Sequence, residues 1–317
     1  MPPSTDILEN PGRAETSLAD DLERIVSSAT VIRRDEPLAR HTTLRVGGPA
    51  DVYVEPASED DLAGIVAFCG GRGAEFFILG RGSNLLVRDG GFRGIVICLS
   101  QPMFGRIEIE GGRLRCGAGA KLKTVAVEAR RHGLSGLEFL EGIPGSVGGA
   151  LRMNAGAMDS QAFDVVESVR LMDFSGNVCE MTPTQMDVKY RACATLKNHI
   201  ALGAVLKGRA DSPESISQRM SAFSQKRWSS QPAAPSAGCI FKNPASIPAG
   251  KLIDELGLKG ARVGGASVSQ EHGNFIVNDG NATARDVLAL IEKLKARAKA
   301  ERGVELQTEV EIVGEDL

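Results

Sequence analysis

The stretch that decides the fold is EGIPGSVGGALRMNAGA, residues 141–157, which holds five glycines among small and polar residues. Glycine is costly in ordered backbone, so this density indicates a main chain that comes close to another group. Successive N–H groups without side chains form a concavity that binds anions, usually phosphate. A structural loop is the alternative. The residues expected to face a phosphate-bearing ligand are Gly142, Gly145, Ser146, Gly148, Gly149, Asn154 and Gly156.

Two further glycine-rich segments lie upstream, HTTLRVGGPA at 41–50 and GRGSNLLV at 80–87. A lone G-x-G is a weak signal, and a tight turn explains it equally well. A nicotinamide-type Rossmann domain is disfavoured, because these glycines lead into a strand–turn–strand pattern and not into a helix. Together the three segments predict a long ligand with a pyrophosphate in its middle. The ligand contacts expected upstream are Gly47, Gly80, Arg81, Gly82, Ser83 and Asn84.

Composition sets the bounds for this chain of 317 residues, a length suited to two or three domains. Its net charge of −3 gives no electrostatic case for nucleic acid or anionic lipid as partner. No apolar run is long enough to span a bilayer, and the polar, acidic start does not resemble a secretion signal. A cytoplasmic protein is therefore expected. The six cysteines lie far apart without a C-x-x-C pair, and the four histidines are scattered, so neither disulfides nor a metal site is expected.

Hydrophobic patterns divide the chain into a lead-in with a helix near Leu18–Ser28 and three zones, at 29–99, 100–210 and 211–317. The first zone alternates strands with a helix that Ser58 caps. The second is rich in strands and includes a hairpin that turns at Gly111-Gly112. The third begins with a helix after Ser212 and ends in VELQTEVEIVG, whose alternation predicts a strand. The other elements expected are strands at 50–56, 76–80, 94–99, 199–208 and 274–279, a hairpin turning at 175–177, and helices at 121–133 and 282–302.

Five motifs in order, HTTLRVGGPA, GRGSNLLV, EGIPGSVGGALRMNAGA, YRAC and GCIFKNP, resemble the UDP-N-acetylenolpyruvoylglucosamine reductase family. The resemblance covers residues 30–315. It implies an α+β chain with two FAD-binding subdomains of the vanillyl-alcohol-oxidase (PCMH) type at 29–99 and 100–210. A C-terminal α+β substrate domain at 211–317 would follow.

The same resemblance implies the reaction. NADPH would reduce non-covalently bound FAD, and a hydride would pass to the β-carbon of UDP-N-acetylglucosamine enolpyruvate. Protonation of the α-carbon would then give UDP-N-acetylmuramate, a peptidoglycan precursor. The implied partners are small molecules, with no nucleic acid and no membrane, and a monomer is the expected state.

Cys239 in GCIFKNP matches the family's proton donor. A thiol is far more acidic than an alcohol, so it protonates a carbon readily. No histidine lies near it in sequence and the reaction needs no covalent intermediate, which favours a general acid over a nucleophile. The alternative is an inert buried thiol, since free cysteine is among the most buried residue types.

Two charged residues complete the set of catalytic residues that the resemblance implies. Arg191 in YRAC has the always-charged fork that suits a carboxylate, although a lone arginine is more often a surface residue. Glu309 lies on the polar face of the expected final strand, and its choice rests on the match to L-x-x-E-V. Its neighbours on that face are Glu305, Gln307 and Glu311.

The resemblance also implies substrate contacts from Tyr190, Lys242 and Asn243. Lys226 and Arg227 could meet the UDP diphosphate, but an ordinary charged helix end is the preferred interpretation of this pair. The chain has only two tyrosines and a short C-terminal zone, so it is similar to the family's shorter-domain type, and how the UDP end is covered stays open.

Two other functions are compatible with parts of the sequence. An oxidase of the same superfamily would tether FAD covalently through histidine or cysteine, but nothing marks His41, the only early histidine, as a tether. A non-enzymatic flavin-binding or UDP-sugar-binding protein is the second alternative. The joint presence of Arg191, Cys239 and Glu309 disfavours it.

Overall fold

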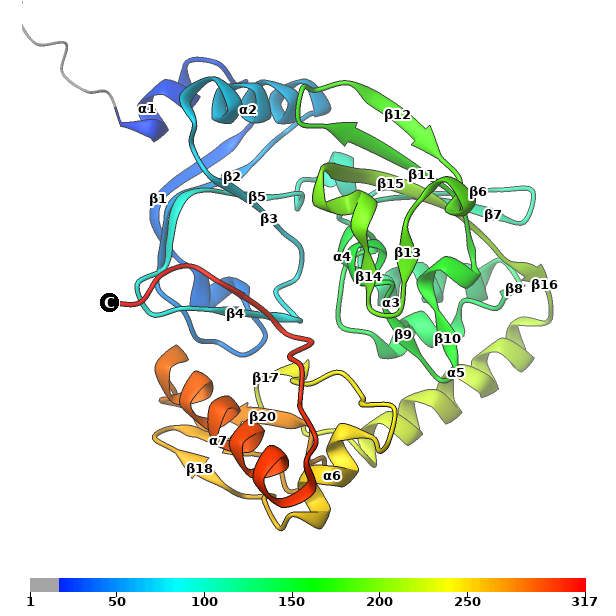
Figure 1. Cartoon of the computed structure of the whole chain (residues 1–317). Coiled ribbons are helices and arrows are strands. Elements are labelled where there is room, and N and C mark those ends of the chain that lie inside the picture. Colours follow the sequence, from blue (N-terminus) through cyan, green and yellow to red (C-terminus); the bar gives the residue numbers. More distant parts are fainter. Residues whose placement is uncertain (1–16) are drawn as a thin grey trace, which may run out of the picture.

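The computed structural model describes residues 17–317, so the expected lead-in lies almost wholly outside the described residues. Three groups of elements surround the middle of the molecule, coloured blue to cyan, green, and yellow to red in Figure 1. They correspond to the two expected subdomains and the C-terminal domain. No helix within residues 17–317 is long and apolar enough to cross a membrane.

Subdomain 1 is built on a four-stranded sheet in the order β1-β2-β5-β3. The strand β5 (Phe92–Cys98) pairs in parallel with both β2 (Pro49–Glu55) and β3 (Phe76–Leu79). The strand β1 (Val31–Pro37) is antiparallel to β2. The helix α2 (Glu59–Arg72) is capped by Ser58, whose Oγ accepts a hydrogen bond from the Asp61 N–H. The strands and the helix predicted for this zone are confirmed.

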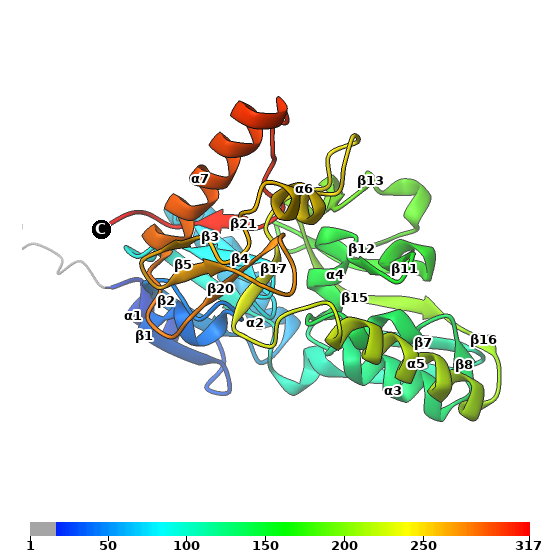
Figure 2. The ribbon, with the colours of Figure 1, turned by 90° about the horizontal axis from the view of Figure 1, so that it is seen from below.

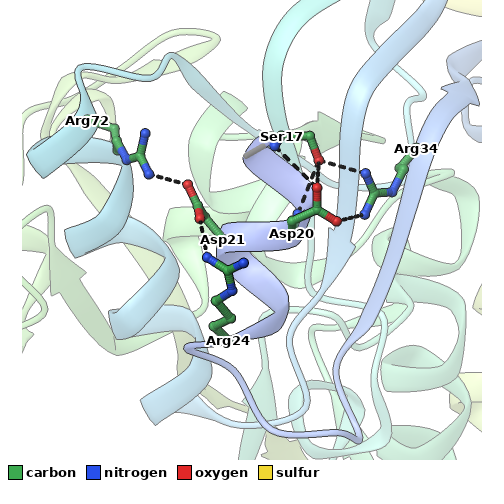
Figure 3. A network of polar contacts seen from close by, with 6 residues as sticks. All are labelled: Ser17, Asp20, Asp21, Arg24, Arg34 and Arg72. Carbon is green, nitrogen blue, oxygen red and sulfur yellow. Dashed lines mark hydrogen bonds and ion pairs between the residues drawn. The ribbon is translucent and has the colours of Figure 1, made fainter. Parts of the chain in front are cut away.

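The first helix, α1 (Leu18–Glu23), is shorter than predicted. The chain turns away because the Ser27 N–H and hydroxyl both bond the Asp61 carboxylate, at 2.8 and 2.7 Å, instead of continuing the helix. Ion pairs hold α1 against its neighbours, as Figure 3 shows. Arg34 of β1 contacts Asp20 at 2.6 Å, and Arg72 of α2 contacts Asp21. The short helix is therefore part of subdomain 1.

Subdomain 2 is a five-stranded antiparallel sheet in the order β12-β11-β15-β7-β6. The hairpin of β6 and β7 turns at Gly111 and Gly112, both with positive φ (53° and 81°), as a two-residue turn requires. This prediction is confirmed, as is the end of α3 at left-handed Gly133. The bounds are β6 Ile107–Glu110, β7 Arg113–Gly117, α3 Leu122–Arg131, α4 Val147–Met153, β11 Val166–Asp173, β12 Val178–Met181 and β15 His199–Lys207.

Short strands and single turns connect these elements. The short strands are β4 Leu85–Val87, β8 Leu134–Ser135, β9 Gly156–Ala157, β10 Ser160–Gln161, β13 Val188–Lys189, β14 Ala192–Cys193 and β16 Arg209–Ala210. The 3-10 turns are η1 Leu38–His41, η2 Pro102–Gly105, η3 Glu138–Gly142, η4 Ala162–Asp164, η5 Pro183–Gln185 and η6 Ala194–Lys197.

The helix α5 (Pro213–Trp228) packs on subdomain 2 and not on the C-terminal domain that the boundary at residue 211 assigned it to. Its apolar side, with Ile216 and Met220, enters the core of the FAD-binding subdomains. Arg219 also bonds the buried Glu138 carboxylate at 2.7 Å. In Figure 2 α5 lies beside α3 and leads towards the C-terminal domain. By packing, that domain begins after Trp228.

The C-terminal domain has an antiparallel sheet in the order β17-β20-β19-β18 with α6 and the long helix α7 packed on it. The bounds are β17 Ser236–Cys239, α6 Ala249–Glu255, β18 Arg262–Val263, β19 Ala266–Val268, β20 Phe275–Asn278 and α7 Ala284–Arg302. Its core also takes in Leu44, Val46 and Leu86 from subdomain 1. The two FAD-binding subdomains share a second core, and subdomain 1 has a third of its own, which includes Tyr53 and Phe92. The C-terminal domain is therefore interlocked with subdomain 1.

The final segment forms a much shorter strand than predicted. Only β21 (Glu311–Val313) is a strand, and it pairs in parallel with β4. The preceding residues instead bond the loop after β17, where the Lys242 N–H meets the Gln307 carbonyl at 2.9 Å and the Glu309 N–H meets the Ile240 carbonyl at 2.8 Å. Figure 1 shows this segment, in red, running from α7 to subdomain 1.

Candidate active site

The loop Gly80–Asn84 follows β3 and exposes a row of main-chain donors. The N–H groups of Arg81, Gly82, Ser83 and Asn84 have no acceptor within residues 17–317. The carbonyl groups of Gly82 and Asn84, by contrast, accept bonds from Thr43 and Glu311. Four successive free N–H groups form the concavity that binds phosphate oxygens. This loop therefore fits the pyrophosphate of a dinucleotide cofactor.

The segment 141–157 forms the other wall of this region. Ser146 caps α4, and the N–H groups of Gly148 and Gly149 bond the Ala118 carbonyl and the Ser146 hydroxyl. The start of α4 thus uses its own donors, and the free donors lie in the loop opposite. A Cβ on Gly80 would lie only 3.2 Å from Ser146 Oγ. The missing side chain lets the two subdomains approach each other here.

Two of the upstream glycines are required by contacts within the protein. Gly82 has φ +60°, and a Cβ on it would lie 2.2 Å from the His41 carbonyl oxygen. A Cβ on Gly47 would lie 2.5 Å from Val87 Cβ. Gly47 and Gly82 were expected to lie close to a ligand. The structure shows that both also lie close to neighbouring backbone and side-chain atoms of the protein.

The end of the glycine-rich segment holds Arg191. Asn154 ends α4, and its amide nitrogen bonds Gln161 at 2.9 Å and the Lys189 carbonyl at 3.3 Å, so its side chain serves the protein. The Gly156 carbonyl lies 3.5 Å from an Arg191 guanidinium nitrogen, and a Cβ on Gly156 would lie 3.2 Å from another. Asn154 and Gly156 thus both contact the loop that carries Arg191.

Arg191, Cys239 and Glu309 come together although they lie on three separate segments. Arg191 Nε is 3.0 Å from Glu309 Oε1, yet this N–H is buried and hydrogen-bonds no acceptor among the described residues. The guanidinium therefore keeps donor capacity for a ligand carboxylate. The charges of both residues act on the Cys239 thiol. The structure brings together the three residues that the motifs singled out.

Burial sets the protonation of this group. Burial and the Glu309 charge together raise the pKa of Cys239 to about 11, and the Arg191 charge opposes this shift. Burial also raises the pKa of the Glu309 carboxyl, and the charges of Arg191 and Lys242 oppose this shift. At neutral pH Cys239 is therefore a protonated thiol, the form that a proton donor needs.

The remaining predicted contacts divide into two kinds. Lys242 and Tyr190 lie beside the charged group, since Lys242 acts on Glu309 and the Arg191 guanidinium lies 5.2 Å from the centre of the exposed Tyr190 ring. Asn243 instead accepts the Ala249 N–H at 3.0 Å, at the start of α6. His41 bonds Glu36 at 2.8 Å and stacks on Tyr53.

The surroundings of Arg227 are more typical of a functional-site residue than the sequence predicts. Its Nε is buried and has no hydrogen-bond partner in the described part of the chain. Burial lowers its pKa, and the Glu141 charge opposes that shift. Its side chain approaches Gly142 of the glycine-rich segment. The sequence pattern does not predict this burial of Arg227, because the residue lies at what looks like an ordinary charged end of a helix.

Asn274 is a residue that sequence reasoning missed. It lies just before β20, is almost fully buried, and bonds the loop that carries Cys239. No motif drew attention to it. An asparagine in an otherwise apolar stretch, NFIV, is the one signal that could have found it.

Comparison with known proteins gives two family matches. Residues 50–182 match the FAD binding domain family. Residues 231–313 match the family described as UDP-N-acetylenolpyruvoylglucosamine reductase, C-terminal domain. The two matches fall on the FAD-binding subdomains and on the C-terminal domain.

Whole-chain relatives carry the same description. The chain is 45% identical to UDP-N-acetylenolpyruvoylglucosamine reductase of Geobacter sulfurreducens, covering 90% of this chain and 95% of the relative. It is 43% identical to that of Caldanaerobacter subterraneus, covering 94% and 98%. Among solved structures, the reductase (MurB) of Thermus caldophilus matches with a TM-score of 0.78 and 38% identity over 90% of this chain and 99% of that one.

The paired subdomains, the loop of free N–H groups and the group of thiol, arginine and carboxylate define an FAD-dependent oxidoreductase with the vanillyl-alcohol-oxidase type of fold. The fold class predicted from the sequence is confirmed. The chain belongs to the UDP-N-acetylenolpyruvoylglucosamine reductase family.

Proposed function

We propose that the protein reduces the enolpyruvyl ether of UDP-N-acetylglucosamine enolpyruvate to UDP-N-acetylmuramate, with NADPH as reductant and Cys239 as proton donor. The observation that carries the proposal is the convergence of Arg191, Cys239 and Glu309 beside the Gly80–Asn84 loop. Gly238 reaches this loop, since a Cβ on it would lie 3.7 Å from the Ser83 carbonyl oxygen. The free N–H groups of residues 81–84 would hold FAD, which would supply a hydride derived from NADPH to the substrate β-carbon.

The residues of the chain supply binding and the proton. The Arg191 fork binds the enolpyruvyl carboxylate, for which its buried Nε–H keeps donor capacity because it hydrogen-bonds no acceptor among residues 17–317, and it stabilises the negative charge that develops there. Glu309, whose Oε1 lies 3.0 Å from Arg191 Nε, orients the guanidinium for the same group. Cys239 Sγ–H then transfers its proton to the α-carbon, and bulk solvent restores it.

The UDP portion extends towards the end of α5 in this proposal. Arg227 offers a buried Nε–H that has no hydrogen-bond partner among the described residues, and Lys226 adds charge in the same turn. Tyr190, exposed over more than half its surface, is available to the sugar end. The protein would act as a monomer in the cytoplasm on a soluble small-molecule substrate, in keeping with the absence of a membrane-crossing helix among residues 17–317.

The test follows the two half-reactions by anaerobic stopped-flow absorbance. NADPH should bleach the flavin, and UDP-N-acetylglucosamine enolpyruvate should restore its colour. Cys239→Ala should bleach normally, but its reoxidation should slow by roughly 100-fold or more, the range that a lost general acid costs. Cys239→Ser should keep partial turnover. Normal reoxidation in the alanine variant would exclude Cys239 as the donor, and bleaching without any recolouring of the wild type would point to another acceptor.

A further inference from the structure

Asn274 clamps the chain directly after Cys239. Its Oδ1 accepts the Phe241 N–H at 2.9 Å, and its Nδ2 donates to the Phe241 carbonyl at 2.8 Å. Its main-chain carbonyl accepts the Ile240 N–H at 2.9 Å. The residue is only 3% exposed. Three bonds from one buried residue thus fix the two positions that follow the thiol.

The sheet does not hold this loop by itself. The ladder between β17 and β20 is irregular between Ser236 and Cys239, where Gly238 has φ +74°. A strand interrupted in this way leaves the direction of the next side chain to other contacts. The Asn274 carboxamide is also close enough to the Cys239 thiol to lower its pKa against the effect of burial.

The opposite side of the same loop carries Glu309. The Ile240 carbonyl accepts the Glu309 N–H at 2.8 Å, while the Ile240 N–H goes to Asn274. Ile240 is therefore bonded on one side to Asn274 and on the other side to the segment that carries Glu309. Asn274 determines where the thiol lies relative to the Glu309 carboxylate and the Arg191 fork.

We propose that Asn274 is a positioning residue, whose carboxamide aims the Cys239 thiol at the carbon that is protonated. This inference rests on the proposed role of Cys239. A displacement of about 1 Å at a reacting group costs up to 100-fold in rate, so loss of the clamp has a kinetic signature.

The test compares Asn274→Ala with Asn278→Ala as a matched control. Asn278 is the same residue type at the opposite end of β20, is also buried, and also bonds backbone, at Leu44 and Gly280, but its carboxamide makes no hydrogen bond to residues 239–241. Both variants should lose stability to a similar extent. FAD content and flavin reduction by NADPH should stay within about twofold of wild type in both, because neither residue touches the Gly80–Asn84 loop.

Only Asn274→Ala should slow reoxidation by substrate, by about 10-fold to 100-fold. Its solvent deuterium isotope effect on that step should rise, because proton transfer becomes rate-limiting. If Asn274→Ala fails to fold, Asn274→Asp replaces it; the carboxylate keeps the acceptor for Phe241 but has no N–H for the carbonyl or the thiol.

Equal slowing in both asparagine variants, or an unchanged isotope effect in Asn274→Ala, would overturn the inference in favour of a purely structural role. The Cys239→Ala variant, measured alongside, separates this failure from that of the proposed function. If that variant reoxidises normally, Cys239 is not the donor and both proposals fall. If it stalls while Asn274→Ala behaves as wild type, only the role of Asn274 is lost.

Discussion

At the scale of single residues, the site combines opposing effects on one thiol. Burial and the Glu309 carboxylate raise the pKa of Cys239, and Arg191 lowers it. The protein thus keeps the thiol protonated beside a cation that would otherwise favour the thiolate. Replacing either Glu309 or Arg191 should therefore shift the pKa of Cys239.

Alkylation of Cys239 by iodoacetamide reports this balance, because only the thiolate reacts. With a pKa of about 11, Cys239 should react slowly at pH 8, and its rate should rise about tenfold per pH unit up to pH 10. Glu309→Gln removes a negative charge, so it should lower this pKa and speed alkylation at pH 8 by several-fold to about tenfold.

The rate is measured by mass spectrometry of the Cys239 peptide, with the exposed Cys179 as internal reference. The Cys179 rate should be the same in wild type and Glu309→Gln. Faster alkylation of both cysteines would indicate general loosening, and a slower Cys239 in the variant would contradict the assigned effect of Glu309.

At this scale the motifs singled out three residues that the structure brings together, but not the residues that support them. Cys239, Arg191 and Glu309 could be proposed because each lies in a motif that resembles the family. Asn274 gives no sequence signal, and Arg227 fits an ordinary charged helix end, because the surroundings of both depend on burial and on partners distant in sequence. Neither a side chain that bonds a neighbouring backbone nor an unpaired buried N–H produces a periodic pattern in the sequence.

At the scale of elements, the loop after β4 binds the C-terminal domain. Asp89 accepts the N–H groups of Ala284 at 2.8 Å and Arg285 at 2.9 Å, both in the first turn of α7. A carboxylate from subdomain 1 therefore caps the longest helix of another domain, where it also meets the positive end of the helix dipole.

Asp89→Ala should lower the free energy of unfolding by about 1 to 2 kcal/mol, the usual cost of a lost helix cap. For a chain of this size that corresponds to a melting temperature roughly 2 to 8 °C lower. Asp89→Asn, which keeps one acceptor oxygen, should lose less. Thermal unfolding followed by circular dichroism measures both.

Asp60→Ala is the matched control, since Asp60 is an exposed aspartate in the first turn of α2 with no hydrogen bond or ion pair among the described residues. It should change the melting temperature by no more than about 1 °C. An Asp89→Ala variant as stable as this control would show that the cap between domains contributes nothing.

Elements whose signals are local were predicted correctly, and those that depend on distant partners were not. The turn at Gly111-Gly112 needs only its own φ angles. The final segment has the alternating pattern of a strand, but residues 307–309 hydrogen-bond the loop after β17 and do not pair with a complete strand. The sequence pattern of α5 likewise does not show which domain its apolar side contacts.

At the scale of the whole molecule, the domain arrangement brings distant parts of the chain together. Asn84 of subdomain 1 bonds the Glu309 carbonyl at 3.1 Å across 225 residues of sequence. The strand β21 then pairs with β4 next to it. Residues 84–87 and the last residues of the chain thus lie side by side.

Contacts between residues so far apart in sequence form slowly, because a long loop must close before any of them is made. On refolding from urea with FAD present, quenching of flavin fluorescence should therefore precede the return of reductase activity. Simultaneous recovery of the two signals would contradict this order. Refolding of Asp89→Ala should lengthen the interval between them.

The pairing of Glu309 with Asn84 also has a meaning for biosynthesis. The ribosome makes the catalytic carboxylate 225 residues after its backbone partner, and the glycine-rich loops and the thiol have emerged by then. A nascent chain halted before residue 309 would carry much of a flavin site and could not complete the chemistry. With Glu309 in its proposed role, only molecules whose synthesis has reached the final segment carry the complete set of site residues.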